Sequence, residues 1–390
     1  MVAHAAVMSA PGQPWDVSAA AWDRHSAMLG EWLKQATTGM LDLAHVGPGA
    51  RVLDIAAGAG DQTLDIARRV GPHGQVLATD ISSRALGLAA DKLRAAGFSN
   101  VTTRVADAQS LGLSGSGFDA AVCRLGLMFC REPLAALVGI HAALKRHGRF
   151  SAVVFSQPQG NPCIAAMVST ARRHAGLPPA SPFDPGTLLS LGQPGLLPAL
   201  LAEAGFVDVE VRVVSAPMHL PSCKHYIAFV RTAGLPVMAL LAPLSAAAQR
   251  EAWRDISEQL ARFSTPSGWV GPNELLLCAG SRAGSAGIRA ENDPKSPALA
   301  QGRSGLGLCC LALGDAPQAR ALADLARAAL HAQPSAGIHY RRSLALLTER
   351  LAADPAPPLR PPHAKVSLPG DGMFAARDAF KGTRPRHRAR

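Results

Sequence analysis

Charged and aromatic residues are scarce in this chain of 390 residues, and the signatures of membrane or secreted proteins are missing. Only 17% of the residues are charged and 5% are aromatic, whereas 48% are hydrophobic, which suits a globular protein with a large core. No apolar run approaches the roughly 20 residues that a membrane-spanning helix needs. The apolar N-terminus has no basic residue before Ala3, so we expect no secretory signal peptide.

The cysteines show no pattern that predicts a disulfide framework or a metal site. There are seven of them, an odd number, and none belongs to a C-x-x-C pair. We therefore expect no bound metal, and free thiols favour the reducing cytoplasm as the location.

Basic residues outnumber acidic ones clearly only in the C-terminal part of the chain. Residues 1–280 hold 22 Lys and Arg against 20 Asp and Glu, whereas residues 281–390 hold 17 against 8. This asymmetry marks an added segment. We predict one domain over 1–280, a Ser-, Gly- and Pro-rich linker over 281–304, a helical extension over 305–352, and a basic, proline-rich tail over 353–390 with the composition of a disordered segment.

The extension and the tail allow two kinds of partner. The helices of the extension have small and apolar residues near the spacing of a single tetratricopeptide repeat, and one such repeat has to pack on the domain or on a protein partner. The tail ends in "KGTRPRHRAR", but no aromatic residue follows Phe380. We therefore expect a solvated tail and no nucleic-acid binding.

Strand and helix patterns alternate through the first 155 residues. Strands are predicted at 51–56, 74–80, 100–107, 118–124 and 149–155, and helices at 61–70, 83–97 and 132–148. Such alternation indicates βαβ units. Together with later strands at 206–214 and 273–280, it predicts an α/β fold: a Rossmann-like, doubly wound, mostly parallel seven-stranded sheet.

Further helices are predicted outside this alternation. They lie at 16–37, 161–176, 187–205, 222–234 and 245–263. Because the last four are inserted between the late strands, we expect a helical cap over the carboxyl end of the sheet, where such folds bind ligands.

The loop after the first strand, in "RVLDIAAGAGDQTLDIA" (residues 51–67), has two of the three glycines of the dinucleotide fingerprint. Gly58 and Gly60 are present, but Thr63 stands where the third glycine belongs. The loop is flanked by Asp54 and Asp61, and carboxylates there disfavour a diphosphate and suit a ligand with a cationic group. A nicotinamide oxidoreductase is excluded on these grounds.

The next two strands also end in acids. Asp80 is placed to accept hydrogen bonds from ribose hydroxyls, and Asp107, followed by Ala108, could accept one from an exocyclic amine. The implied ligand is an adenosine with a cationic tail and no phosphate, a description that S-adenosylmethionine meets.

Residues 14–280 resemble the class I S-adenosylmethionine-dependent methyltransferases, in the group similar to the ubiquinone/menaquinone-biosynthesis enzymes. The resemblance is carried by "VLDIAAGAGD", "VLATDIS", "ADAQSL", "FDAAVCRLGLMF" and "LKRHGRF", in this order. Ala56 departs from the pattern, since the family often has glycine there.

The resemblance implies roles for individual residues. It assigns Asp54 and the backbone of residues 56–60 to the methionine moiety, Asp80 to the ribose, and Asp107 with Ala108 to the adenine. Ile81 either packs on the adenine or belongs to the core. Arg124, a cation beside a sulfonium, needs a carboxylate partner, which the cofactor or an acidic neighbour would supply.

The acceptor side is less defined. The segment with Met128 and Phe129 lies at the mouth of the sheet, so these side chains face the acceptor or belong to the core. Transfer from an activated sulfonium needs mostly alignment and exclusion of water. An oxygen acceptor would also need a base, and the candidates by chain location are His25, His174, His219 and His225.

Two functions remain open from the sequence. The first is a methyltransferase acting on a small, hydrophobic or aromatic acceptor, with no catalytic residue assigned. The second is a non-catalytic S-adenosylmethionine-binding protein that acts through its C-terminal helices. The intact acids and glycines favour the enzyme.

Overall fold

A computed structural model describes residues 12–113, 115, 117–284, 316–331 and 338–353. Its first half alternates helices and strands. In chain order these are α1 (Gln13–Arg24), α2 (Ser26–Leu43), β1 (Arg51–Ile55), α3 (Asp61–Val70), β2 (Gln75–Asp80), α4 (Ser83–Ala95), β3 (Val101–Val105), η1 (Ala108–Ser110), β4 (Phe118–Arg124), η2 (Leu127–Phe129), α5 (Pro133–Ala143) and β5 (Leu144–Phe155).

The second half adds mostly helices before the last strands. These elements are α6 (Pro162–His174), α7 (Leu196–Glu203), β6 (Phe206–Ser215), β7 (Met218–Leu220), α8 (Cys223–Ala233), α9 (Leu235–Leu241), α10 (Ala246–Ala261), β8 (Ser264–Thr265), β9 (Gly268–Gly271), β10 (Glu274–Arg282), α13 (Ala316–His331) and α14 (Ile338–Ala353). No described helix is long and apolar enough to cross a membrane.

The central sheet has seven strands in the order β3-β2-β1-β4-β5-β10-β6. The neighbours from β3 to β5 run parallel, and β10 runs antiparallel to both β5 and β6. The predicted mostly parallel, Rossmann-like sheet is confirmed. The strand order reverses between β1 and β4, which is where doubly wound sheets bind ligands.

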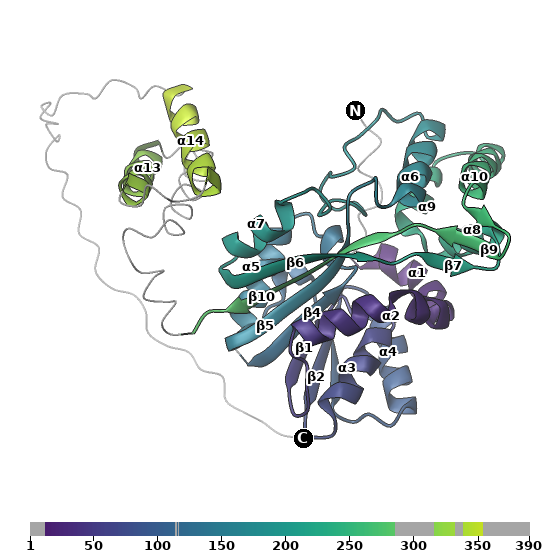
Figure 1. The fold of residues 1–390 in the computed structure, drawn as a ribbon, viewed down its shortest axis with the longest axis horizontal. Helices are drawn as coiled ribbons and strands as arrows, with labels where there is room; N and C mark the ends of the chain where they lie inside the picture. Colours follow the sequence, from purple (N-terminus) through teal and green to yellow (C-terminus); the bar gives the residue numbers. More distant parts are fainter. Residues whose placement is uncertain (1–11, 114, 116, 285–315, 332–337, 354–390) are drawn as a thin grey trace, which may run out of the picture.

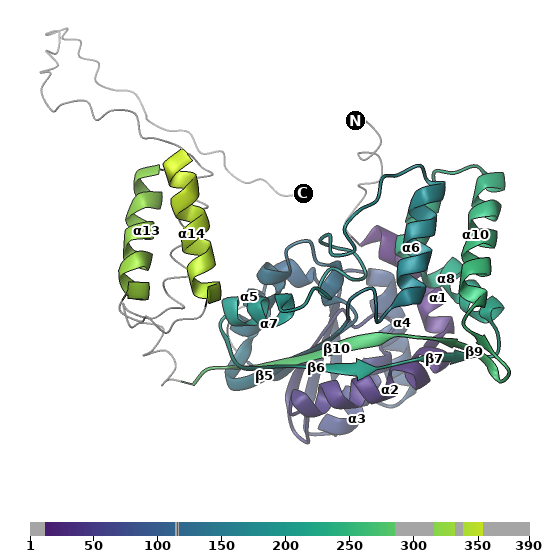
Figure 2. The same ribbon diagram turned by 45° about the horizontal axis from the view of Figure 1, so that its top comes forward.

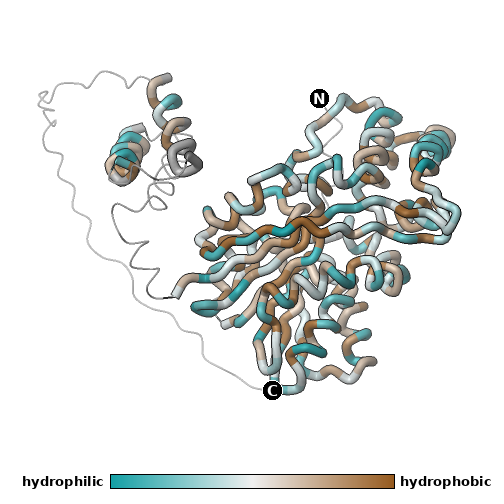
Figure 3. Tube along the Cα trace, viewed as in Figure 1, coloured by the Kyte–Doolittle hydropathy of each residue, from teal (hydrophilic) through white to brown (hydrophobic). Residues whose placement is uncertain are grey.

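Helices cover both faces of this sheet (Figure 1). Helices α2, α3 and α4 pack on one face, and α5 and α7 on the other. The inner strands are buried on both sides and read as nearly continuous apolar runs, visible as brown segments in Figure 3, whereas the edge strands β3 and β6 are mostly exposed or half-buried. Val52, Leu53 and Ile55 of β1 are all at most 1% exposed.

Three of the four inserted helices form the cap that the sequence predicts at the carboxyl end of the sheet, whereas the helix predicted over 187–205 is only α7 (Leu196–Glu203), which packs on the face of the sheet beside α5. Helices α6, α8, α9 and α10 contact one another there, next to a small sheet of order β7-β9-β8 (Figure 2). The small sheet was not predicted, because its strands have two to four residues and too few positions to show a period.

Two helix predictions differ from the structure in ways that bear on the site. The helix predicted over 16–37 is broken at His25, whose ring packs edge-on against Phe229 with the centroids 5.1 Å apart. No glycine or proline marks this break. The helix predicted over 132–148 ends at Ala143, because Leu144 is fully buried and already pairs with Phe118 as part of β5.

The boundary of the predicted first domain is also slightly extended. Strand β10 continues past Gly280 to Arg282, whose guanidinium donates hydrogen bonds to the carbonyls of Ala142 and Leu144. Helices α13 and α14 lie side by side beyond the linker (Figure 2), and Ala319, Ala323 and Leu347 are buried between them. The first part of the predicted helical extension, residues 305–315, and the tail at 353–390 lie outside the described residues, apart from Ala353, and a tetratricopeptide-like unit stays a prediction.

Truncation tests this boundary. We expect a chain ending at Gly284 to keep the Tm of the methyltransferase-like sheet, since every strand is complete. A chain ending at Gly280 should melt several degrees lower, because it loses Arg282 and the hydrogen bond from Arg149 to Ser281. Thermal unfolding followed by circular dichroism compares the two. Equal melting of both chains would show that the last two residues of β10 add nothing.

Candidate cofactor site

A pocket of about 210 Å³ lies at the carboxyl ends of the parallel strands, and α1 covers it. Most of the residues predicted to bind the cofactor are brought together here. Those that line the pocket are Ala56, Gly58, Asp80, Ile81, Asp107, Ala108, Arg124 and Phe129. Asp54, Gly60 and Met128 do not line it. A wider cleft of about 690 Å³ at the opposite edge of the sheet is lined by none of the predicted site residues.

The glycine loop requires left-handed backbone at three places. Ala56, Gly58 and Gly60 have φ of 55°, 56° and 85°. At Gly60 a Cβ would also lie 2.8 Å from that of Ala89 in α4, so glycine is needed for both reasons. Ala56 adopts the same region with a methyl group, which is strained for a non-glycine residue.

Asp54 lies behind the loop and not in the pocket wall. Its carboxylate is fully buried and accepts hydrogen bonds from Gln62 and from the Thr63 hydroxyl, the latter at 2.6 Å. Burial raises the pKa of Asp54 to about 7, although these two hydrogen bonds and the nearby Arg124 oppose the shift. Thr63 thus replaces the third glycine of the dinucleotide pattern with a hydroxyl that holds Asp54.

Gln62 is the residue of this loop that sequence reasoning missed. It lines the pocket, whereas Asp54 does not. The signal available was its place in the first turn of α3, directly after the glycine loop, where side chains are close to any ligand at the helix N-terminus.

Asp80 ends β2 and joins the two loops of the site. One carboxylate oxygen accepts from the backbone N–H of Gly58 at 2.9 Å, and the other accepts from that of Ser82 at 2.8 Å. Burial raises the pKa of Asp80, and the hydrogen bonds from the backbone limit the rise. Each oxygen keeps a lone pair for a further donor.

Asp107 follows β3 and closes the same edge of the pocket. Its side chain accepts a hydrogen bond from the backbone N–H of Gln109 at 2.9 Å and caps η1. Ala108, Gln109 and Cys130 line the pocket beside it. Burial, with the nearby Asp107, raises the pKa of the Cys130 thiol to about 12, which keeps it protonated at neutral pH.

Arg124 ends β4 and brings a half-buried cation to the pocket wall. Its guanidinium donates to the Thr37 hydroxyl at 2.9 Å. Within the described part of the chain it forms no ion pair with a carboxylate. Burial lowers the pKa of Arg124, while more distant carboxylates, Asp61 and Asp54 first, oppose this. A half-buried guanidinium with one hydroxyl partner suits a ligand that carries a carboxylate.

One face of α1 forms the cover of the pocket. Trp15, Ser18, Ala19 and Trp22, spaced by three or four residues, all line it. Trp15 packs edge-on against Phe129 with the ring centroids 4.8 Å apart. Trp22 lines the pocket and also packs edge-on against Phe229, with the ring centroids 5.8 Å apart.

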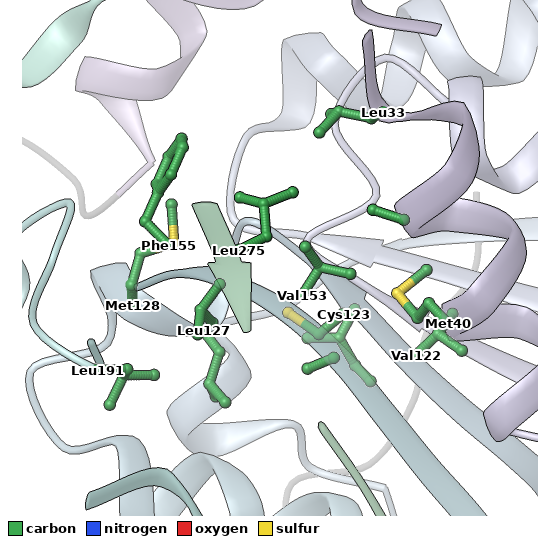
Figure 4. Packing of buried hydrophobic residues seen from close by; sticks show 14 of the residues in the cluster. Leu33, Met40, Val122, Cys123, Leu127, Met128, Val153, Phe155, Leu191 and Leu275 are labelled. Carbon is green, nitrogen blue, oxygen red and sulfur yellow. The ribbon is translucent and has the colours of Figure 1, made fainter. Parts of the chain in front are cut away.

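Met128 and Phe129 separate into different environments. Met128 is 1% exposed and packs in the core near Leu127, Phe155 and Leu191, as Figure 4 shows. The prediction that it faces the acceptor is corrected, because η2 turns its side chain into the core. Phe129 is half-buried and lines the pocket.

None of the four candidate histidine bases lines this pocket. His174 lies on α6 beside Asp255, at 3.0 Å, and His225 lies near Ser222 at 2.9 Å. His25 packs on Phe229 at the α1–α2 junction, and His219 belongs to β7. The pocket wall, over the described residues, therefore contains no histidine.

Comparison with known proteins identifies the domain that carries this pocket. Residues 47–178 match the family model of the methyltransferase domain. The ubiquinone/menaquinone biosynthesis C-methyltransferase of Teredinibacter turnerae is 41% identical over 122 residues, which make up 31% of this chain and 49% of that protein. The protein of the same name from Ectopseudomonas mendocina is 38% identical over 131 residues, or 33% and 51% of the two chains. This chain spans about half the length of the curated relatives it matches.

Solved structures align over a larger part of the chain at lower identity. The YcgJ protein of Bacillus subtilis is 18% identical, with a TM-score of 0.44, over 65% of this chain and all of its own.

The segment 47–178 is a methyltransferase domain of the class I, S-adenosylmethionine-dependent type. The resemblance to the ubiquinone/menaquinone-biosynthesis group is confirmed for this part, and S-adenosylmethionine is the cofactor of this class.

Asp54 should give the fold a distinct pH dependence. Because the folded-state pKa is about 7 and the ordinary value is 3.8, the native state holds a proton that the unfolded chain releases. Asp54 therefore makes stability fall as pH rises from about 4 to about 7, by at most about 1.4 kcal/mol per unit, with no further change above 7.

Urea unfolding of wild type and Asp54→Asn between pH 4.5 and 8 measures this. We expect the stability of the variant relative to wild type to improve steadily up to pH 7. Parallel pH profiles for the two proteins would contradict a protonated Asp54.

Proposed function

We propose that this protein transfers a methyl group from S-adenosylmethionine to a small, hydrophobic or aromatic acceptor. The observation that carries the proposal is the half-buried Arg124, which faces the same pocket as Asp80 without a carboxylate partner among the described residues. A ligand with a carboxylate at one end and a ribose at the other could pair with Arg124 and donate hydrogen bonds to Asp80 at the same time.

The chain's own residues bind and orient this ligand. Arg124 pairs with the amino-acid carboxylate, Asp80 accepts from the ribose hydroxyls, and Asp107 with Ala108 borders the adenine. The bound cofactor supplies a methyl group already activated on a sulfonium sulfur. The cover formed by α1 excludes water, which is most of what an in-line displacement asks of a protein.

The acceptor is less closely defined. The family match ends at residue 178, so it includes α6 of the cap but not α8, α9 and α10. The names of the relatives nevertheless support including quinols among the acceptors tested. The absence of a histidine from the described pocket wall favours an acceptor that attacks without a protein base, such as an electron-rich ring carbon or an ionised oxygen.

Calorimetric titration tests the cofactor, and a matched variant tests the site. We expect S-adenosylmethionine and S-adenosylhomocysteine to bind and NADH not to bind. Asp80→Asn should weaken binding by about 1.5–3 kcal/mol, because an amide cannot accept from the ribose and both backbone N–H groups as a carboxylate does. Unchanged affinity in a folded Asp80→Asn protein would remove the ribose assignment.

Activity then separates the enzyme from a non-catalytic binding protein. Methyl transfer from labelled S-adenosylmethionine to a panel of quinols, phenols and carboxylic acids is the assay. Cofactor binding without transfer to any of them, in the full chain and in the chain ending at Gly284, would favour the binding protein.

Met128 and Phe129 form a matched pair for the pocket wall. Phe129→Ala should weaken S-adenosylhomocysteine binding about two- to tenfold, because the Trp15 contact is worth about 0.5–1.5 kcal/mol. Met128→Ala should instead cost about 2–5 kcal/mol of folding stability, with affinity within about twofold, since its side chain fills the core. Affinity and Tm, measured for both variants, distinguish these outcomes. Weaker binding in Met128→Ala together with a lower Tm in Phe129→Ala would contradict the placement of the two side chains.

A further inference from the structure

Lys92 of α4 brings three separate elements together on one ammonium group. Its Nζ lies 2.5 Å from Asp61 Oδ1, 2.8 Å from Asp23 Oδ1 and 3.0 Å from the Ser26 hydroxyl. The lysine side chain is 22% exposed. An ammonium has three N–H donors, and here each has an acceptor.

The three acceptors belong to the two sides of the cofactor pocket. Asp61 is the first residue of α3, directly after the glycine loop, and it lines the pocket. Asp23 lies in the last turn of α1, and Ser26 is the first residue of α2. The junction of α1 and α2 and the glycine loop therefore meet at Lys92.

The close approach of Asp23 and Asp61 depends on the positive charge of Lys92. Two carboxylates share the one ammonium, so without it they would face each other unneutralised. Burial by itself lowers the pKa of Lys92, but the hydrogen bonds to Asp23 and Asp61 outweigh burial and raise the pKa above its ordinary value. The ammonium thus stays charged over the physiological range.

The other end of α1 is held on the same helix by different contacts. Asp16 accepts hydrogen bonds from the Ser82 hydroxyl at 2.6 Å and from the backbone N–H of Arg84 at 3.1 Å. A Cβ on Gly12 would lie 2.2 Å from the carbonyl oxygen of Ile81, so the chain approaches the pocket closely there too. Helix α1 is therefore attached to α4 at both ends, and the contact at Lys92 also includes Asp61, which directly follows the glycine loop.

We propose that Lys92 is a positioning residue that couples closure of α1 over the pocket to the placement of Asp61, the residue directly after the cofactor-binding glycine loop. The inference rests on the proposed function, because it takes the pocket as the cofactor site. Lys92 does not line the pocket, so its effect is exerted through Asp61 and through the α1–α2 junction.

The test compares Lys92→Met with Arg94→Met on the same helix. Arg94 pairs with Asp91 at 2.8 Å, but both side chains are about three-quarters exposed, so this pair is a matched control. We expect Lys92→Met to release S-adenosylhomocysteine at least about tenfold faster in stopped-flow experiments, and Arg94→Met to stay within about twofold of wild type.

Hydrogen exchange shows whether the effect is one of coupling. In wild type, S-adenosylhomocysteine should slow amide exchange in both α1 and the glycine loop. In Lys92→Met the slowing of α1 should be lost while the loop at residues 56–60 is still protected by bound ligand. Loss of affinity with α1 still protected would assign Lys92 to the loop alone and overturn the proposal, as would wild-type release rates in the variant.

Two milder variants keep the test decisive if Lys92→Met does not fold. Asp23→Asn removes the charge on the α1 side only, and it should speed release and weaken α1 protection while leaving the Tm within a few degrees. Lys92→Arg keeps the charge but not the compact three-way geometry, so its release rate and α1 protection should lie between those of Lys92→Met and wild type.

The failure of this inference is distinguishable from the failure of the proposed function. If wild type binds neither S-adenosylmethionine nor S-adenosylhomocysteine, the proposed function fails. If wild type binds normally and the variants behave like wild type, only the role of Lys92 is refuted.

Discussion

The carboxylate of Asp80 is the contact on which the geometry of the site depends. It accepts one hydrogen bond from Gly58 in the loop after β1 and one from Ser82 at the start of α4. Because β1 and β2 are parallel neighbours, their carboxyl ends meet at one edge, and this side chain fixes the two loops relative to each other. The pocket lies between those loops, and the N-terminal end of α1 is attached to the second one through Ser82.

The site also solves an electrostatic problem. Several carboxylates gather at the pocket proposed to bind S-adenosylmethionine, which is itself part anion and part cation, and each is controlled differently. Asp54 is buried with a raised pKa, Asp61 is paired with Lys92, and Asp80 is bonded to the backbone. Arg124 is the cation without a carboxylate partner among the described residues, which gives an incoming carboxylate a defined place.

Much of the fold could be predicted because its inner parallel strands are buried on both faces. Such strands appear as short apolar runs separated by helices, and their order in the chain specifies the sheet. Predictions became wrong where tertiary contacts override local pattern. The helix after β4 ends early because Leu144 joins the sheet, and the N-terminal helix breaks at His25 because its ring packs on Phe229.

The sequence by itself predicted the class of ligand and eight of the residues that line the pocket. The glycines, the acids that end β2 and β3, and the missing third glycine are local features, and βαβ connectivity brings them to one edge. Only the tertiary structure decided which side chains reach the pocket. Gln62, and not Asp54, lines the pocket. The Met128 side chain lies in the core, whereas that of Phe129 lines the pocket. Asp23, Asp61 and Lys92 come together from three different helices. These outcomes depend on side-chain direction and on contacts between residues 31 to 69 positions apart, which no local pattern records.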